Sequence, residues 1–546
     1  MNRLYSVLPL LGGVAAALCL GSCQKEAVLT TARPGTTSGS NALTCTPRPE
    51  SPDYRFYPLG NGLAPVGDVM PYYDATAPTG KFKIFYLKDV WNDATNQRHP
   101  WYGLQTDDFA AFADLSGGQQ LACSADGCKQ DFALGTGHIV QKGSTYYAFY
   151  TGHNPNYPSG CVTRKEGIML ATAPALNQSF TKNTSFATIY APAGQGFDDN
   201  DNFRDPFVYF DSATGTYHMI VAARKNVSGV WRGVVARYTS PNLLNWTYQG
   251  VLYDGGPDNF FMLETPELFR QGSTYYLLFS DINSKNLYYR KSTSLTGPWS
   301  APSGPSRFEG QGLYAAKTVL DQYGDRYIFG WTNRLAGNTD TGAWLWGGNL
   351  VTHKLYQLPN QDLAVTIPHT LQTRAETSAV PLSKDSQWGN VTNVQAGTES
   401  YRLSSPADKD VANVLYAPIG PARYKLHCTV SYSSAAKDFG FLLGACDGYD
   451  DVYSLRFVPG QQRFSFDRTR RSQLSSTTVA TNDVPFALSP GVEYDLTIVF
   501  ENSVVVVYLN HVAALTSRIY RAPGTSWGIF VDNSTATFKN ITVTQP

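Results

Sequence analysis

The chain has 546 residues, more than one hydrophobic core usually organises, so at least two folded units fit. Only 16% of the residues are charged, and 43 Lys and Arg balance 43 Asp and Glu, which excludes the basic surface that nucleic-acid binding needs. Uncharged ligands such as sugars remain as partners. The 34 Tyr, 28 Phe and 10 Trp suit β-structure and also provide flat faces on which sugars stack.

The first 22 residues are typical of an export signal. Arg3 gives a positive start, an apolar run extends from Leu8 to Leu20, and Leu20-Gly21-Ser22-Cys23 resembles a bacterial lipobox. We therefore expect residues 1–22 to be a lipoprotein signal peptide and Cys23 to be lipidated, with a plain secretory signal as the alternative. The apolar run is too short to cross a bilayer. The expected location is the bacterial cell envelope, at the outer membrane or cell surface, with the lipid as the only anchor.

Residues 23–52 are rich in Thr, Ser, Pro and Gly and predict a flexible tether. Export permits disulfides. Cys123 and Cys128 flank a turn sequence, which favours a local bridge, and Cys428 and Cys446 fall on adjacent predicted strands; with Cys45 and Cys161 also present, the pairing stays open. The cysteine spacings lack the companion His pair of a metal site, so we expect no metal and no cofactor.

Residues 53–370 repeat a weak unit that consists of a polar turn, an alternating strand, a tight turn and an aromatic-rich strand. The aromatic-rich strand recurs at 81–87, 144–150, 215–221, 273–279 and 325–331. A recurrence every roughly 50–70 residues is typical of propeller blades. Helical periodicity is nearly absent. The repeat therefore predicts a five-bladed β-propeller.

Alternating strands return after a polar stretch near 373–395. They lie at 424–432, 440–443, 463–467, 494–500 and 504–509. Evenly spaced strands with turn residues between them predict a β-sandwich over residues 371–546. The expected fold class is all-β, a five-bladed β-propeller followed by a β-sandwich. Because the second unit contains no repeated acidic motif, we expect it to pack against the propeller or to hold glycan.

Three carboxylates stand where innermost propeller strands are predicted to begin. They are Asp68 in Val66-Gly67-Asp68-Val69-Met70-Pro71, Asp205 in Phe203-Arg204-Asp205-Pro206, and Glu264 in Leu263-Glu264-Thr265-Pro266-Glu267-Leu268-Phe269. Innermost strands line the central channel, so we expect these acids to meet at the funnel mouth. Cleavage of a glycosidic bond requires a pair of acids. A turn residue at a blade edge is the alternative for Asp68 and Asp205, and Glu267 competes with Glu264.

These motifs resemble glycoside hydrolase family 32, the fructan and sucrose hydrolases. Arg204-Asp205-Pro206 matches the family's Arg-Asp-Pro, and Glu264-Thr265-Pro266 matches its Glu-Cys-Pro except that threonine replaces cysteine. The segments 312–318, 328–331 and 515–520 are similar to its fifth blade and C-terminal sandwich. The family's Trp-Met-Asn-Asp-Pro-Asn-Gly motif corresponds to residues 65–73, which keep the acid and lose the flanking Asn residues.

The resemblance implies a role for each acid. Asp68 is expected to be the nucleophile, Glu264 the acid/base, and Asp205 a ligand of ring hydroxyls. Asp68 must then be ionised while Glu264 holds a proton, and Arg204 is expected to bind substrate and to keep a carboxylate ionised. The candidate stacking residues are Trp91, Trp101 and Trp331, together with His99, Trp344 and Trp346.

The activity implied by the resemblance is hydrolysis, with retention of configuration, of fructofuranosyl linkages in levan, inulin, sucrose or related oligosaccharides. Two alternatives stay open. One is an inverting arabinanase or xylosidase of the family 43 type, which shares the propeller and the three acids; the other is a glycan-binding lipoprotein without activity. A retaining site needs the carboxyl groups of Asp68 and Glu264 about 5–5.5 Å apart, whereas an inverting site needs about 6.5–9.5 Å.

Overall fold

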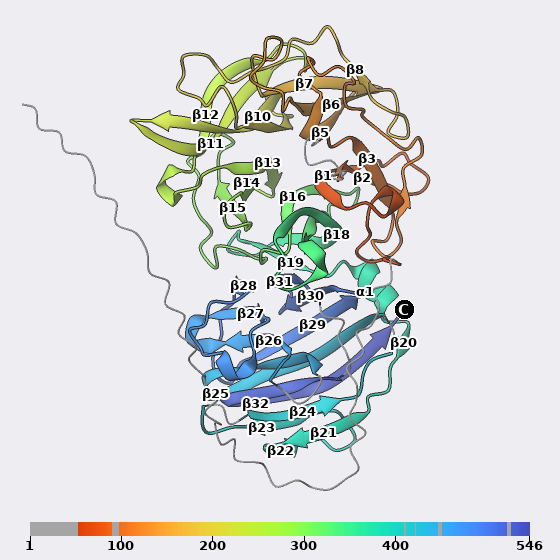
Figure 1. Ribbon diagram of the computed structural model, residues 1–546, viewed down its shortest axis with the longest axis vertical. Helices are drawn as coiled ribbons and strands as arrows, with labels where there is room; N and C mark the ends of the chain where they lie inside the picture. Colours follow the sequence, from red (N-terminus) through yellow and green to blue (C-terminus); the bar gives the residue numbers. More distant parts are fainter. Residues whose placement is uncertain (1–52, 90–97, 409–410, 421, 446–449, 521–525) are drawn as a thin grey trace, which may run out of the picture. The chain divides into compact units, whose positions relative to one another are not determined.

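The computed structural model describes residues 53–89, 98–408, 411–420, 422–445, 450–520 and 526–546, all within one compact unit. The predicted signal peptide, Cys23, the tether and Trp91 lie outside the described residues. Strands dominate, and α1 (His369–Ala375) is the only α-helix in the described part of the chain (Figure 1). None of the helices found there is long and apolar enough to span a membrane. The described residues thus form the all-β fold that the sequence predicts.

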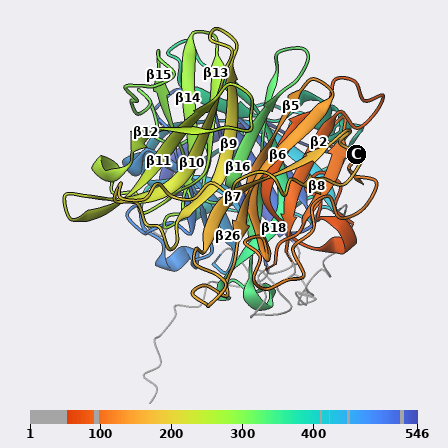
Figure 2. The same ribbon diagram turned by 90° about the horizontal axis from the view of Figure 1, so that it is seen from above.

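Five blades of antiparallel strands follow one another along the chain. Figure 2 shows these strands from above. Blade one contains β1 (Val66–Tyr73), β2 (Phe82–Lys88), β3 (Trp101–Thr106) and β4 (Ala113–Asp114), and blade two contains β5 (Ala133–Lys142), β6 (Thr145–His153), β7 (Glu166–Ala173) and β8 (Thr181–Lys182). Blade three contains β9 (Phe203–Asp211), β10 (Thr216–Val227), β11 (Val230–Ser240) and β12 (Thr247–Asp254), and blade four contains β13 (Leu263–Gln271), β14 (Thr274–Asp281) and β15 (Leu287–Ser292). Blade five contains β16 (Tyr314–Leu320), β17 (Arg326–Leu335), β18 (Trp344–Gln357) and β19 (Leu363–Thr366). The pairing of β1 with β18 joins the first and the last blade into one eight-stranded sheet. The aromatic-rich strands predicted from sequence are β2, β6, β10, β14 and β17.

The innermost strands β1, β5, β9, β13 and β16 form a ring, because each contacts the innermost strands of the two neighbouring blades. All five contain a β-bulge at the same place, where two residues oppose one on the next strand. The bulged pairs are 67–68, 135–136, 205–206, 265–266 and 315–316. Asp205, Thr265 and Ala315 adopt φ values of 59°, 48° and 51° there, which bulky residues seldom do. Each inner strand therefore bends at the same place, where its bulge lies.

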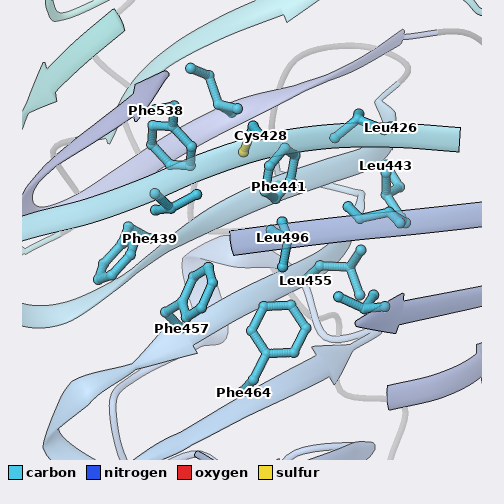
Figure 3. Close-up of a cluster of buried hydrophobic side chains, with 14 of the residues drawn as sticks. Leu426, Cys428, Phe439, Phe441, Leu443, Leu455, Phe457, Phe464, Leu496 and Phe538 are labelled. Atoms are coloured by element: carbon cyan, nitrogen blue, oxygen red, sulfur yellow. The ribbon is translucent and has the colours of Figure 1, made fainter. Parts of the chain in front are cut away.

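The remaining strands build the C-terminal sandwich. They are β20 (Ser378–Ala379), β21 (Lys384–Trp388), β22 (Asn390–Asn393), β23 (Tyr401–Ser404), β24 (Val411–Tyr416), β25 (Arg423–Ala445), β26 (Tyr453–Val458), β27 (Arg463–Asp467), β28 (Asn482–Pro485), β29 (Glu493–Glu501), β30 (Val504–Leu509), β31 (Ala513–Arg518) and β32 (Ser526–Gln545). The strands predicted at 424–432 and 440–443 are two parts of β25. Figure 3 shows the core of the sandwich, in which Phe441, Phe457 and Leu496 are fully buried. Burial of such side chains is the main driving force for folding.

Short 3₁₀ turns connect several of these strands. They lie at Asn61–Leu63, Gly256–Asp258, Ala336–Asn338, Pro459–Gln461 and Arg471–Gln473. The last of them places Arg471 in a buried ionic cluster inside the sandwich. Its guanidinium donates to both oxygens of Asp438, at 2.6 and 2.7 Å, and to Asp532 at 3.0 Å. Bidentate pairing of this kind satisfies charges that would otherwise be costly to bury.

The sandwich packs against blade five. Val506 and Tyr508 of β30 belong to the same buried cluster as Ile328, Leu350 and Val365 of the propeller. Polar groups are paired across this junction: Glu309 accepts hydrogen bonds from the backbone N–H of Thr516, at 2.8 Å, and from its hydroxyl, at 3.0 Å. The two parts therefore share a hydrophobic core.

One disulfide is present among the described cysteines, and it joins Cys128 to Cys161. The local bridge between Cys123 and Cys128 that the turn sequence favoured is therefore wrong. The Cys123 thiol instead donates to the carbonyl oxygen of Arg98, at 2.8 Å. Cys428 is a free, buried thiol in the sandwich, and Cys446 lies outside the described residues.

Candidate active site

The three predicted acids come from three different inner strands. Each acid lies at or directly beside the β-bulge of its own strand, but at a different position relative to that bulge. Glu264 is the last paired residue before the bulge of β13, Asp205 is the first bulged residue of β9, and Asp68 is the second bulged residue of β1. Because the innermost strands form a ring, the three side chains line one pocket of about 220 Å³. The other lining residues are Leu87, His99, Leu134, Gly135, Thr136, Thr151, His153, Glu166, Arg204 and Trp346.

Asp68 is held by two donors from neighbouring blades. The Thr136 hydroxyl donates to one carboxylate oxygen at 2.5 Å, and the indole N–H of Trp331 donates to the other at 3.1 Å. Burial and the negative charge of Asp205 raise the pKa of Asp68 to about 7, although both donors act in the opposite direction. Asp68 is therefore fixed in orientation, but its raised pKa runs against the expectation that this carboxyl is fully ionised at neutral pH, because burial disfavours its charged form.

Asp205 is anchored through its backbone as well as its side chain. Its N–H donates to the Thr151 hydroxyl at 2.8 Å, and its carboxylate accepts the backbone N–H of Thr265 at 2.9 Å. Burial raises the pKa of Asp205 to about 6; Arg204 opposes this shift, whereas the charge of Glu264 adds to it. The contact with Thr265 links the bulge of β9 directly to the bulge of β13.

Glu264 has a different environment from the other two acids. Arg204 donates to one of its oxygens at 2.7 Å, and the Tyr314 hydroxyl donates to the other. Burial and the charge of Glu264 raise the pKa of Tyr314 well above its usual value, so this hydroxyl stays a donor. Glu267, the sequence competitor, is bonded to the backbone and hydroxyl of Thr318 and does not line the pocket.

Glu166 is a fourth carboxylate in the pocket, and it stands in no recognisable motif. It accepts the backbone N–H of Phe203 at 2.8 Å, and its oxygen lies 3.5 Å from the Arg204 guanidinium and 3.4 Å from Nδ1 of His153. Burial alone would raise its pKa, but Arg204 and His153 outweigh burial and hold the pKa at about 2. Arg204 thus bridges Glu166 and Glu264.

Two of the predicted stacking residues are corrected by the structure. Trp101 and Trp331 are both 0% exposed. Trp101 is packed in the core between blades one and two and donates to the carbonyl oxygen of Gly135 at 3.2 Å. Trp331 contributes its N–H to Asp68 rather than a ring face to a ligand. Residues of neighbouring blades cover both rings, and the local sequence contains no sign of this burial.

Trp346 and His99 do line the pocket, and their rings lie 4.4 Å apart. Gly67 lies directly against Trp346, since a Cβ added there would approach an indole carbon to 1.9 Å. In the family motif an Asn precedes the acid. In this chain Gly67 stands at the position of that Asn and has no side chain, which leaves space for the indole of Trp346. The bulky Trp346 of β18 thus occupies the space next to the altered first motif.

The pocket contains carboxylates that can act as acid, base or nucleophile, and it contains hydrogen-bond donors that can bind the hydroxyl groups of a ligand. The described residues contain no group of three or more His, Cys, Asp or Glu side chains placed to hold a metal ion. A propeller with these acids at the mouth of its ring of inner strands defines the class of propeller glycosidases. The family models for the N-terminal and C-terminal domains of glycosyl hydrolases family 32 match residues 75–361 and 385–545. The chain belongs to this family.

The similarity to individual relatives is limited. A raffinose invertase of Escherichia coli is 29% identical over 161 residues, which cover 27% of this chain and 33% of the relative. A sucrose-6-phosphate hydrolase of Staphylococcus xylosus is 25% identical over 245 residues, or 42% and 46% of the two chains. The chain therefore spans between a third and a half of the length of these relatives.

Solved structures of the same fold cover almost all of the chain. A GH32 beta-fructofuranosidase of Bombyx mori matches with a TM-score of 0.63 and 16% identity, over 90% of this chain and 93% of that one. A fructosyltransferase of A. japonicus matches with a TM-score of 0.64 and 16% identity, over 94% and 98%. At this identity the likeness shows the fold, a β-propeller with a β-sandwich.

Proposed function

We propose that this protein is a retaining glycoside hydrolase that cleaves fructofuranosyl linkages in sucrose, levan, inulin or related oligosaccharides. The observation that carries the proposal is the convergence of Asp68, Asp205 and Glu264 on one pocket. Asp68 is oriented by two neutral donors, whereas Glu264 is held by the Arg204 guanidinium and the Tyr314 hydroxyl. Family membership and the names of the relatives, an invertase and sucrose-6-phosphate hydrolases, support the choice of a fructosyl substrate.

The proposed reaction has two steps. Glu264 gives its proton to the glycosidic oxygen while an oxygen of Asp68 attacks the anomeric carbon, so the bond to the leaving group breaks and an ester to Asp68 forms. Glu264 then takes a proton from water, and the resulting hydroxide displaces Asp68 from the sugar. Asp205 and Arg204 hold sugar hydroxyls, and charge-assisted hydrogen bonds of this kind position a substrate strongly.

Residues 53–546 assayed against sucrose, levan, inulin and arabinan test the substrate. Asp68→Asn and Glu264→Gln should each abolish turnover and keep the fold, because both changes are nearly isosteric. Wild-type cleavage of arabinan alone would move the chain to the inverting alternative, and sugar binding without any turnover would make it a binding protein. Proton NMR of the first-formed anomer tests retention, and an inverted product would eliminate Asp68 as nucleophile.

Envelope anchoring is a separate part of the proposal. The lipobox ending at Cys23 supports a lipid-modified N-terminus, attached by acyl chains alone. A Cys23→Ser variant should therefore be released in soluble form with full activity, while the natural chain partitions with membranes. Mass spectrometry of the natural N-terminus should find acyl groups on Cys23. Recovery of the natural chain from the periplasm without detergent and without acyl groups would contradict this part.

A further inference from the structure

Lys317 of β16 is a buried cation to which the reaction described above gives no role. Its side chain is 0% exposed, and its ammonium donates to the carbonyl oxygen of Gly137 at 2.7 Å and lies 5.8 Å from the centre of the Phe207 ring. It forms no ion pair with any residue in the part of the chain that the structure describes. A buried ammonium is costly unless opposite charges stabilise it. The surroundings of Lys317 therefore decide whether it is charged.

Each of the other four inner strands contributes a titratable group that interacts with Lys317: Asp68 of β1, His138 of β5, Asp205 of β9 and Glu267 of β13. Burial lowers the pKa of Lys317 to about 8, and the charges of the three carboxylates oppose this shift, Asp205 most strongly. Burial and the charge of Lys317 hold the pKa of His138 well below its usual value, so this imidazole is neutral. At pH 7 Lys317 is therefore a cation that interacts with three acids.

The three acids depend on this cation to different degrees. Glu267 has a second cation, Arg326, whose charge acts on it more strongly than that of Lys317, and the backbone N–H and hydroxyl of Thr318 donate to its carboxylate. Asp68, in contrast, is held by two neutral donors. Loss of Lys317 would therefore leave Glu267 beside Arg326, but it would leave Asp68 with its neutral donors.

The carbonyl group that binds this ammonium directly follows the bulge of β5, which holds two of the pocket acids. Gly137 comes after Thr136, whose hydroxyl donates to Asp68 at 2.5 Å. The carbonyl oxygen of Thr136 accepts the Thr151 hydroxyl at 3.0 Å. The same hydroxyl accepts the backbone N–H of Asp205 at 2.8 Å. A shift of the Gly137 peptide would therefore disturb the groups that hold both acids.

We propose that Lys317 is a positioning residue of the reaction, which holds the bulge of β5 in place and favours the charged forms of Asp68 and Asp205. The inference rests on the proposed function and adds a residue that acts from outside the pocket, since Lys317 is not among the residues that line it. A nearby positive charge favours a carboxylate over its acid. This effect matters most for Asp68, because the nucleophile must be ionised while burial disfavours its charge.

The pH profile of kcat/KM for sucrose tests the proposal. Lys317→Met removes the charge and should move the acidic limb to higher pH by about half a unit, so activity falls about threefold more at pH 6 than at pH 9. Lys317→Arg keeps the charge and should leave the limb in place. Lys83→Met is the matched control, because Lys83 is also buried, donates to the neutral amide of Gln105 at 2.7 Å and lies outside the pocket. An unmoved limb in Lys317→Met, or an equal shift in either other variant, overturns the proposal.

Titration of the acids can be followed without turnover. Carbon-13 NMR of protein labelled at its aspartate carboxyl groups gives the pKa of Asp68, whose signal is absent from the spectrum of Asp68→Asn. This pKa should rise by about half a unit in Lys317→Met. A rise in a protein that cleaves no fructoside would remove the proposed function and keep the effect of Lys317 on Asp68. An unchanged pKa overturns the proposal, and so does a Lys317→Met variant that fails to fold or melts more than about 10 °C below the wild type, because the ammonium would then serve the fold.

Discussion

Single residues set the protonation of the pocket, and Asp68 is the clearest case. Its pKa is raised to about 7 by burial and by Asp205, so two hydrogen bonds decide how much of it is ionised at neutral pH. A donor stabilises the carboxylate relative to the acid, and a bond to a charged group contributes about 1.5–3 kcal/mol. The Thr136 hydroxyl, at 2.5 Å, is the shorter of the two bonds.

Thr136→Val is expected to raise the pKa of Asp68 further, because the ionised form loses a donor. The acidic limb of the kcat/KM profile should move to higher pH by about one unit, since one pKa unit corresponds to about 1.4 kcal/mol. Activity should therefore fall more at pH 6 than at pH 9. Thr181→Val, an exposed change on β8, is the control and should leave the profile unchanged. An acidic limb that stays in place in Thr136→Val would show that Asp68 does not control it.

Glu166 contributes to stability through its depressed pKa. A carboxylate whose pKa is about 2 in the folded chain, below the usual 4.5 of a glutamate, stabilises the fold fully above pH 4.5 and loses this contribution as the pH falls toward 2. The difference corresponds to about 3 kcal/mol. Glu166→Gln should therefore lower the free energy of unfolding at pH 7 by about this amount and at pH 3 by somewhat less than half of it.

Urea denaturation at the two pH values measures this difference. Asp201→Asn is a matched control, because Asp201 forms a partly exposed pair with Lys165, and such pairs contribute at most about 1 kcal/mol. If Glu166→Gln destabilised the chain equally at pH 7 and pH 3, its effect would come from packing rather than from its charge.

The individual strands can be predicted from the sequence, whereas contacts between neighbouring blades cannot. The strands follow from alternating and aromatic-rich runs, and β27 and β30 begin and end at the predicted residues. The acids were found because they follow strand starts in recognisable motifs. Glu166 was missed because it begins β7, which is not an innermost strand, and its role depends on Arg204 of the next blade. Trp101 and Trp331 were misread because burial by a neighbouring blade leaves no local signal.

The contact between Gly67 and Trp346 couples β1 to β18. Gly67→Ala places a Cβ inside the van der Waals radius of the indole, so the ring or the strand that carries Asp68 must shift. We expect kcat/KM to fall at least 100-fold, since small displacements of catalytic groups are costly. In a Trp346→Ala background the same Gly67→Ala change should cost less than tenfold. A double-mutant cycle measures the coupling, and additive effects would contradict it.

For the whole molecule, the shared core makes the two parts depend on each other. Val504, Val506, Tyr508 and Ala514 of the sandwich are almost fully buried in the same cluster as residues of blade five. His353, at the junction, is fully buried between Glu309, with a 2.8 Å contact, and the Tyr508 hydroxyl, at 2.9 Å. Removing the sandwich would expose apolar surface and take away the Tyr508 partner of His353 and the Thr516 partner of Glu309.

A propeller fragment of residues 53–377 should therefore not fold stably alone. We expect it to aggregate on expression, or to bind a hydrophobic dye strongly and unfold at least 15 °C below residues 53–546. Co-expression of residues 378–546 should restore solubility, because it returns β30 and β31 to the exposed face of blade five. The Glu309→Gln variant of the longer chain separates the two contributions: it keeps the apolar contacts and removes only the buried charge beside His353. A soluble, active propeller fragment would show that the propeller does not depend on the shared core for its stability.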